Sequence, residues 1–267
     1  MKSIISEKIY APIVLIGLPI EELYTYIVST ISTNLCSIKI SIKSSDKCNK
    51  NVDYSDIENT IFSYINMFLT EIDVSCVDGK IEVQCAKKAP EISLFAVITM
   101  EIIKNILELK RINYREILHT LSLFDEKLFK GASTYIRSLR CSYLYRSLCI
   151  SKGFDEDIMF KFRPIEADIV AEVGCSRVPC LCVKYSFDKY LMNYILKLFS
   201  YVISKLSSDL REVKDIENRT KDMVRLVYSI ENVFASYISE TKIDINMLHF
   251  VKPITNFNSI SFYLIQF

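Results

Sequence analysis

The fold prediction rests mainly on the stretch KKAPEISLFAVITMEIIKNILEL, residues 87–109. Pro90 and Glu91 suit the first turn of a helix, because a first-turn proline loses no hydrogen bond and an acid is favoured at the positive end of the helix dipole. From Ile92 to Leu109 the residues favour a helix and are mostly apolar on every side, which is typical of a buried helix. We therefore predict a central helix over Ile92–Leu109, enclosed by a sheet and by other helices.

Strands and helices are predicted on both sides of this helix. Strands are indicated by apolar runs or by alternation of apolar and polar residues, and helices by apolar stripes behind a capping residue. Ser44–Tyr54 is polar and predicts a loop, and the pair Asp78-Gly79 predicts a hairpin turn. The predicted strands are Lys8–Gly17, Leu35–Ile42, Val74–Val77, Lys80–Cys85, Ala167–Val173, Pro179–Tyr185 and Ile260–Ile265. The other predicted helices are Ile57–Phe68 with Ser55 or Asp56 as its cap, Asn113–Glu126, Ser133–Leu148, Asp188–Ser208 and Thr220–Glu240.

The pattern of the chain changes near Phe160. Before this point the predicted helices follow one another, and after it strands alternate before two long helices. We find no internal repeat. We expect an α+β protein of two lobes in close contact, residues 1–159 and residues 160–267.

The composition is that of an ordinary globular protein, with 50% hydrophobic and 24% charged residues in a chain of 267. Lys and Arg number 33 against 32 Asp and Glu, so no net field attracts nucleic acid or an anionic membrane. The longest apolar stretch, near Ala11–Ile20, is too short to cross a bilayer, and no signal peptide precedes it. We expect a cytoplasmic protein that binds neither nucleic acid nor a membrane.

Nine cysteines and two histidines are the residues most able to bind a metal or to react. Cys175, Cys180 and Cys182 lie close together, but they lack the spacing of a thiolate metal site and no histidine is near. His119 and His249 match no nucleophile or metal pattern. We expect no metal, and nine free thiols that are mostly buried, because an odd set without framework spacing has no reason to pair.

Glycine is scarce in this chain. An average usage of roughly 7% would give about nineteen glycines in this length, and the chain has five, which are Gly17, Gly79, Gly131, Gly153 and Gly174. Loops that cradle phosphate bring several backbone N–H groups close to it, and side chains get in the way. The sequence therefore argues against a glycine-rich phosphate loop.

Two groups of basic residues are candidate anion contacts. Lys87 and Lys88 precede the central helix, where cations reinforce the attraction of a helix N-terminus for phosphate, although a polar loop explains them equally well. Arg137, Arg140 and Arg146 are interleaved with tyrosines and could hold an anion or stack a base. At helical spacing the favoured interpretation is a solvated basic face beside a buried aromatic face.

The order of these features resembles the GHMP family of small-molecule kinases over nearly the whole chain. It runs from a strand with Tyr10-Ala11-Pro12, through the Asp78-Gly79 pair, the long apolar helix and a second helix that starts Tyr114-Arg-Glu, to Gly131-Ala132-Ser133, a second lobe and a terminal strand. Within the family, the archaeal shikimate kinases look closest in length and motif spacing. The resemblance implies an N-terminal α/β lobe of ribosomal-protein-like topology and a C-terminal ferredoxin-like lobe.

The resemblance also implies where the three motifs of the family fall. The phosphate loop falls on residues 87–96, the acidic motif on residues 130–135, and the glycine-rich third motif on residues 252–259, which hold no glycine. Kinase chemistry depends on groups that position the phosphates and Mg²⁺. Because these three segments lack the residues that do so in the family, we expect no catalytic residue. The degenerate equivalents are Lys87, Lys88, Pro90 and Ser93 in the phosphate loop, and Thr134 and Tyr135 in the acidic motif.

We interpret the chain as a catalytically degenerate homologue that binds a partner protein, associates with itself or holds a small ligand in the remnant cleft, with no cofactor. One alternative is a working kinase that uses ATP and Mg²⁺ to phosphorylate an alcohol, shikimate kinase being the nearest named activity. Another is a structural subunit of a larger assembly, for which 16 Tyr and 15 Phe supply interface side chains. Nucleotide binding separates the working kinase from the other two interpretations.

Overall fold

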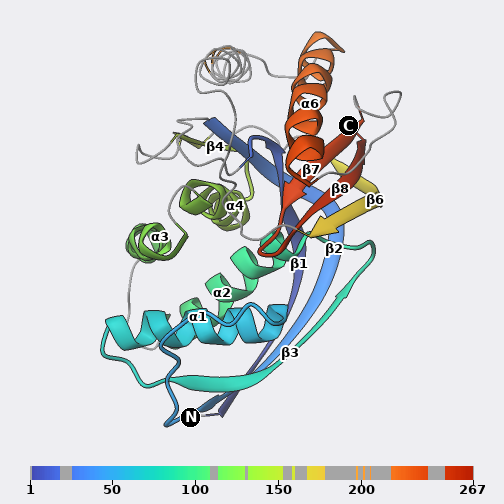
Figure 1. Cartoon of the computed structure of the whole chain (residues 1–267). Helices are drawn as coiled ribbons and strands as arrows, with labels where there is room; N and C mark the ends of the chain where they lie inside the picture. The colour runs from blue at the N-terminus through green and yellow to red at the C-terminus, as the bar shows by residue number, and fades with distance from the viewer. Residues whose placement is uncertain are drawn as a thin grey trace.

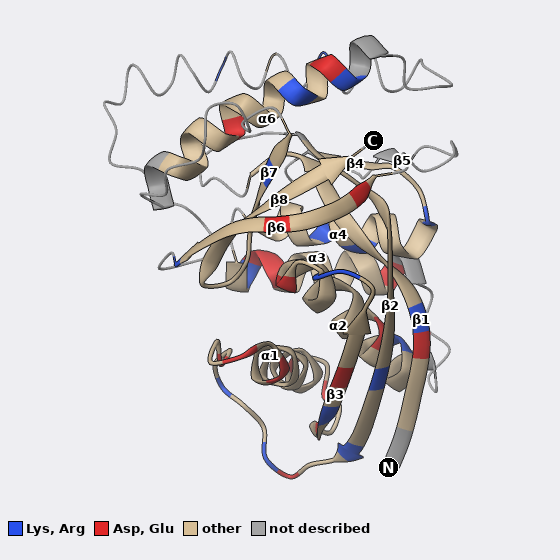
Figure 2. Cartoon of the chain, turned by 90° about the vertical axis from the view of Figure 1, so that its right-hand side faces the viewer, with Lys and Arg blue, Asp and Glu red and all other residues tan. Residues whose placement is uncertain are grey.

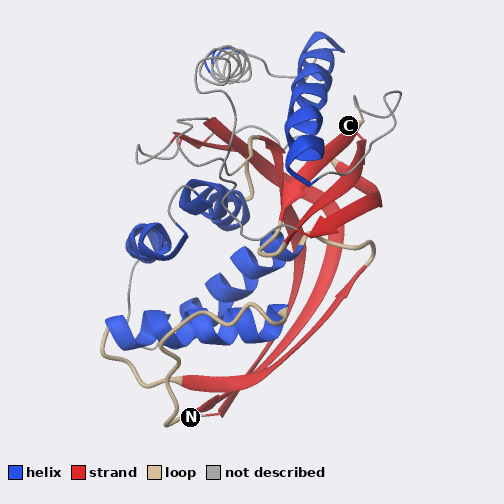
Figure 3. Ribbon diagram, in the orientation of Figure 1, coloured by secondary structure: helices blue, strands red, loops and turns tan. Residues whose placement is uncertain are grey.

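The computed structural model describes residues 2–18, 26–108, 114–129, 132–152, 158–159, 167–177, 197, 201, 205, 218–239 and 250–266. Long, curved strands run through the first part of the chain, and the helices of that part lie on one side of them (Figure 1, Figure 3). A smaller sheet and the long helix α6 lie at one end of these strands. The chain is an α+β protein, as predicted.

The first sheet is antiparallel and is built around a long second strand. Strand β1 (Lys2–Ile16) pairs with β2 (Tyr26–Ser44), β2 pairs with both β3 (Val77–Cys85) and β4 (Cys149–Lys152), and β4 pairs with β5 (Ile158–Met159). Residues 31–43 of β2 alternate between more buried and more exposed positions, as predicted for Leu35–Ile42, because one face of the sheet packs on the helices, whereas residues 27–30 are all buried.

Four helices cover this face, and α2 is the innermost of them. They are α1 (Ile57–Glu71), α2 (Glu91–Glu108), α3 (Tyr114–Phe129) and α4 (Ser133–Tyr145). Helix α2 packs on β1 and is flanked by α1 and α4, and both of its faces are buried. This confirms the prediction for Ile92–Leu109 within two residues. Asp56 caps α1 by accepting a hydrogen bond from Asn59 N at 2.8 Å.

The second sheet has the order β6-β8-β7, with β6 at Asp168–Arg177, β7 at Val251–Thr255 and β8 at Ser259–Gln266. Helix α6 (Asn218–Ser239) packs on β7. Strand β7 is not predicted from the sequence. The predicted elements Pro179–Tyr185 and Asp188–Ser208, and the predicted boundary near Phe160, lie outside the described residues or almost wholly so. Among the described residues, none of the helices combines the length and the apolar composition that a bilayer crossing requires.

The predicted hairpin at Asp78-Gly79 is wrong. Strand β3 runs straight through this pair, and Gly79 lies opposite Ile42 in the ladder with β2. A Cβ atom at Gly79 would lie 1.9 Å from Ser41 O and 2.9 Å from Phe62 Cζ. The glycine therefore permits close approach to β2 and α1, which is the other common reason for glycine inside a strand.

The predicted set of nine free thiols is also contradicted. Disulfides link Cys36 to Cys85, Cys48 to Cys76, and Cys141 to Cys149, with Cα–Cα separations of 3.9, 5.6 and 6.1 Å. The fold brings these cysteines together across the β2–β3 ladder, between a loop and the start of β3, and between α4 and β4. Cys spacing along the chain does not reveal such pairs, because each depends on tertiary contacts.

Substitution of Gly79 by alanine should destabilise the protein by at least about 1–3 kcal/mol, because the added methyl group cannot avoid the Ser41 carbonyl. Gly174→Ala is the matched control, since its Cβ would meet only Phe262 Cδ2 at 3.7 Å, an ordinary contact. Urea unfolding of both variants measures the difference. Equal midpoints would mean that β3 does not approach β2 as described.

Alkylation of the unfolded, unreduced protein should leave the six paired cysteines unmodified and should modify Cys175, which is free and exposed. Peptide mapping by mass spectrometry then identifies each linked pair. Modification at all nine positions would instead support the prediction from sequence and refute the disulfides.

Candidate functional site

The start of α2 is the place where the fold offers an anion site, because a helix N-terminus presents unpaired N–H groups and a positive dipole end. Here most of those groups are already used. Ser93 N and Leu94 N donate to Pro90 O, both at 3.1 Å, and Ile92 N donates to Asn256 Oδ1 at 3.2 Å. The protein thus satisfies this helix end with its own atoms.

Asn256 belongs to the turn that joins β7 to β8, residues 256–258, which we call the β7–β8 turn. Its backbone N donates to Ser259 O at 2.7 Å, and its amide nitrogen lies 3.2 Å from Ser261 Oγ. The side chain is therefore held on both sides while its oxygen faces α2. By resemblance to the kinase family, a degenerate glycine-rich motif falls here, and the sequence does not reveal that the turn caps the helix.

Phe257 of the same turn fills the space beside the helix start. Its ring centroid lies 4.8 Å from that of Phe95 and 5.8 Å from that of Phe129. Phe257 and Phe95 are both buried, so the turn is fixed by apolar packing as well as by hydrogen bonds. On the other side of the turn, Asn258 Nδ2 donates to Tyr54 O at 2.9 Å.

The two lysines ahead of α2 are ion-paired with β6. Lys87 Nζ contacts Asp168 Oδ2 at 2.5 Å, and Lys88 Nζ contacts Glu172 Oε2. Figure 2 shows acidic positions along β6. The hydrogen bond from Lys87 holds the pKa of Asp168 below its ordinary value, and the bond to Glu172 raises the pKa of Lys88. Both cations are thus neutralised by acids from the second sheet.

The backbone of the same loop is fixed by Asn34 of β2. Lys87 N donates to Asn34 Oδ1 and Asn34 Nδ2 donates to Lys87 O, both at 2.9 Å. Of the other equivalents in the predicted phosphate loop, Pro90 is buried and supplies the carbonyl that Ser93 N and Leu94 N share. Ser93 Oγ is buried and has no hydrogen-bond partner among the described residues.

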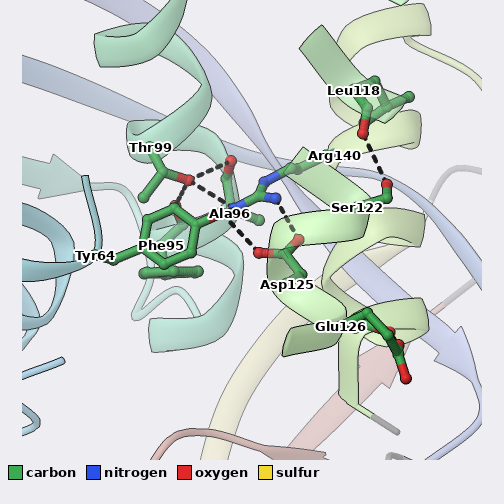
Figure 4. Close-up of polar contacts among 10 residues, drawn as sticks. Tyr64, Phe95, Ala96, Thr99, Leu118, Ser122, Asp125, Glu126 and Arg140 are labelled. Carbon is green, nitrogen blue, oxygen red and sulfur yellow. Dashed lines mark hydrogen bonds and ion pairs between the residues drawn. The ribbon is translucent and has the colours of Figure 1, made fainter. Parts of the chain in front are cut away.

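Arg140 does not face solvent, contrary to the favoured interpretation of a solvated basic face. Its side chain is fully buried, and its Nη1 contacts Asp125 Oδ2 at 2.5 Å (Figure 4). Its Nη2 donates to Tyr64 Oη at 3.1 Å and to Thr99 Oγ1 at 3.2 Å. Burial outweighs the attraction of Arg140 and raises the pKa of Asp125. Arg140 is a structural ion-pair partner that joins α4 to α3, α1 and α2.

The other predicted site residues are dispersed around α4. Arg137 and Thr134 are half-buried, and Tyr135 is buried, with burial as the main cause of the raised pKa of its hydroxyl. Arg146 is exposed at the end of α4. Residues 134 and 135 are not acids, and beside them Glu126 of α3 accepts a hydrogen bond from Ser133 Oγ. Lys130, Gly131, Cys180, Cys182 and His249 lie outside the described residues.

A second buried ion pair, which the sequence does not reveal, holds the end of β1. Glu231 of α6 and Lys252 of β7 are both fully buried and lie 2.5 Å apart. Glu231 Oε1 accepts from Gly17 N at 2.6 Å, and Lys252 Nζ donates to Gly17 O at 2.9 Å. Burial raises the pKa of Glu231 and lowers that of Lys252. Gly17 has φ 112°, a conformation that favours glycine.

In the part of the chain that the structure describes, no group of three or more His, Cys, Asp or Glu side chains is arranged to hold a metal ion.

Comparison with solved structures agrees with the architecture described above. No protein-family model matches the sequence, and no curated protein matches it. The Lin0012 protein from Listeria innocua is similar in structure with a TM-score of 0.55 and 10% identity, over 98% of this chain and 90% of that one. The mevalonate kinase of Methanococcus jannaschii is similar with a TM-score of 0.51 and 12% identity, over 98% of this chain and 91% of that one.

The chain has a GHMP-kinase fold. At this identity the likeness concerns the fold alone, and the closer resemblance to archaeal shikimate kinases remains a prediction.

Replacing Arg140 by alanine should cost about 3–5 kcal/mol of stability, because Asp125 would remain buried without its partner. The double variant Arg140→Met with Asp125→Leu removes both charges and should be much closer to the wild type. Urea unfolding of the two variants compares them. A single variant as stable as the wild type would mean that the pair is solvated.

Proposed function

We propose that this GHMP-fold protein does not transfer phosphate and acts by binding a protein partner or a second copy of itself. The occupied N-terminus of α2 carries this proposal. Ile92 N and Ser93 N, two of the first-turn N–H groups that a phosphate would need, are bonded within the chain, and the ring of Phe257 packs against Phe95 beside them. Glu91, exposed in the first turn, adds a negative charge where phosphate would approach.

Without free N–H groups at the start of α2, nucleotide binding loses a large part of its free energy. Each hydrogen bond to a charged group contributes roughly 1.5–3 kcal/mol, so the loss of several would weaken nucleotide binding by orders of magnitude. Lys87 and Lys88 recover only a small part of this energy, because both are partly exposed to water, where a flexible side-chain charge contributes little. The missing acid of the second motif removes the group that would orient a substrate hydroxyl or Mg²⁺.

Partner binding is supported by the face of the first sheet that points away from the helices. Ile4, Tyr10 and Leu35 are exposed there, and Tyr10 lies opposite Leu35 in the β1–β2 ladder. Leu35 also lines a hollow of about 490 Å³, together with Lys8, Ser37, Gln84, Cys85 and Ala86. Exposed apolar side chains beside a hollow are typical of an interaction surface. The same surface would serve a structural subunit.

One observation favours the second candidate, a working kinase close to shikimate kinase. Ser93 Oγ is buried at the start of α2 and has no partner among the described residues, and a phosphate oxygen would satisfy it. This candidate requires the β7–β8 turn to move away from α2, so that Asn256 releases Ile92 N.

We propose the cytoplasm as the location. Disulfides are uncommon in the reducing cytoplasm, and those that occur there are usually catalytic or redox-sensing rather than structural. The three disulfides among the described residues therefore count against this location, and a native preparation with nine free thiols would favour it.

Mg-ATP at millimolar concentration should not raise the melting temperature, and no phosphorylation of shikimate, mevalonate or homoserine should be measurable. A working site filled at one hundred times its Kd would add about 2.7 kcal/mol of stability, which a thermal melt detects readily. The control is the same melt on the double variant Asn256→Gly, Phe257→Ser. This variant lacks the Asn256 side-chain cap and the Phe257 ring that cover the start of α2. A wild-type melt that rises with Mg-ATP would support the working kinase.

A further inference from the structure

The three disulfides differ in how far solvent can reach them. Cys141 and Cys149 are fully buried, and Cys36 is fully buried while Cys85 is half-buried. Cys48, in contrast, is exposed in the loop that follows β2, and only its partner Cys76 is buried. Thiol–disulfide exchange requires access of the attacking sulfur, so an external thiol reaches the exposed Cys48 before Cys85, which is half-buried in the lining of the hollow beside Leu35.

The surroundings of Cys48 favour an anionic attacker. Lys47 and Lys50 flank it in an exposed segment, with Asp46 beside them, and Asp78 interacts electrostatically with Lys47 as well as with Lys43. Lys43, at the end of β2, is ion-paired with Asp78 at 3.1 Å. Thiolates are the reactive form of thiols, and nearby cations stabilise them. The local charge therefore suits a small thiol of negative net charge, such as glutathione.

The buried partner, Cys76, has a hydrogen-bond acceptor ready for its thiol. Cys76 Sγ lies 3.6 Å from Thr70 Oγ1, and Thr70 Oγ1 donates its own hydrogen to Asn66 O at 2.7 Å. A reduced Cys76 would therefore donate its S–H to Thr70 Oγ1. This site accommodates a neutral thiol inside the protein without leaving a polar hydrogen unpaired.

We propose that Cys48–Cys76 is a thiol–disulfide exchange site for an anionic small thiol. The thiolate attacks Cys48 Sγ, a new sulfur–sulfur bond forms there, and the Cys48–Cys76 bond breaks. The proton that the attacking thiol has lost is taken up by the Cys76 thiolate, which becomes a thiol. The products are a mixed disulfide at Cys48 and a free thiol at Cys76, with no change in the number of sulfur–sulfur bonds.

Exchange at this site changes one segment and leaves the core in place. The loop that carries Cys48 is held at its two ends by Ser45 N, which donates to Cys76 O at 2.9 Å, and by Asp53 N, which donates to Ser63 Oγ at 2.8 Å. Opening the disulfide therefore frees the residues between these anchors from the start of β3. The modified segment would then display an anionic group in place of the covalent link. This inference does not depend on whether the protein binds nucleotide.

The test treats the full-length oxidised protein with reduced glutathione at increasing concentration, followed by acid quenching and peptide mapping. We expect glutathione on Cys48 and a free thiol at Cys76 while the other two pairs remain linked and circular dichroism shows a folded protein. Opening of Cys36–Cys85 or Cys141–Cys149 first, or no exchange before unfolding, would overturn the proposal. Isolation of the native protein with all nine thiols free would also overturn it.

Two variants separate the chemistry from simple exposure. Cys48→Ser should abolish the glutathione adduct, and an adduct that persists in this variant would show reaction elsewhere. Lys47→Gln with Lys50→Gln should slow the reaction with glutathione about threefold to tenfold, as expected for two charges near a solvated anion. The rate at which this double variant reacts with neutral 2-mercaptoethanol should stay within about twofold of the wild-type rate. Equal slowing with both thiols would contradict the role of the lysines.

Discussion

A helix that is buried on every side must find partners for its first N–H groups inside the protein, and this constraint governs the structure described here. Helix α2 lies between β1 and the helices α1 and α4, so water does not reach its middle. At its start the chain uses Pro90 O and Asn256 Oδ1 as acceptors. The β7–β8 turn is thereby docked onto the first part of the chain, and the position where this fold offers an anion site is filled.

Two buried ion pairs, through their further hydrogen bonds to Tyr64 and to Gly17, connect elements that are far apart in sequence. Arg140 and Asp125 link α4 to α3, with Tyr64 and Thr99 completing the hydrogen bonds. Glu231 and Lys252 link α6 to β7 and hold both backbone groups of Gly17 at the end of β1. Buried pairs add little net stability but are costly to break singly. They therefore specify which elements meet more than they strengthen the core.

The acids on β6 show why lysines near the start of a helix do not by themselves indicate an anion site. Lys87 and Lys88 precede a helix, which is where a phosphate site would place cations. Asp168 and Glu172 come from a strand that follows about eighty residues later, and they neutralise these cations. The distribution of charge in space, and not its presence in the sequence, decides whether an anion is attracted.

Local pattern was sufficient to predict the elements whose structure depends on their own residues. The apolar girth of Ile92–Leu109 predicted α2, alternation predicted residues 35–42 of β2, and a cap followed by a stripe predicted α1, because burial imposes these patterns on the sequence. Asp78-Gly79 was misread, since glycine at a close contact and glycine in a turn look alike in sequence. The three disulfides, the burial of Arg140 and the cap from Asn256 could be decided only by the tertiary structure. Each joins residues whose proximity is created by the packing of other elements, and no local spacing records that.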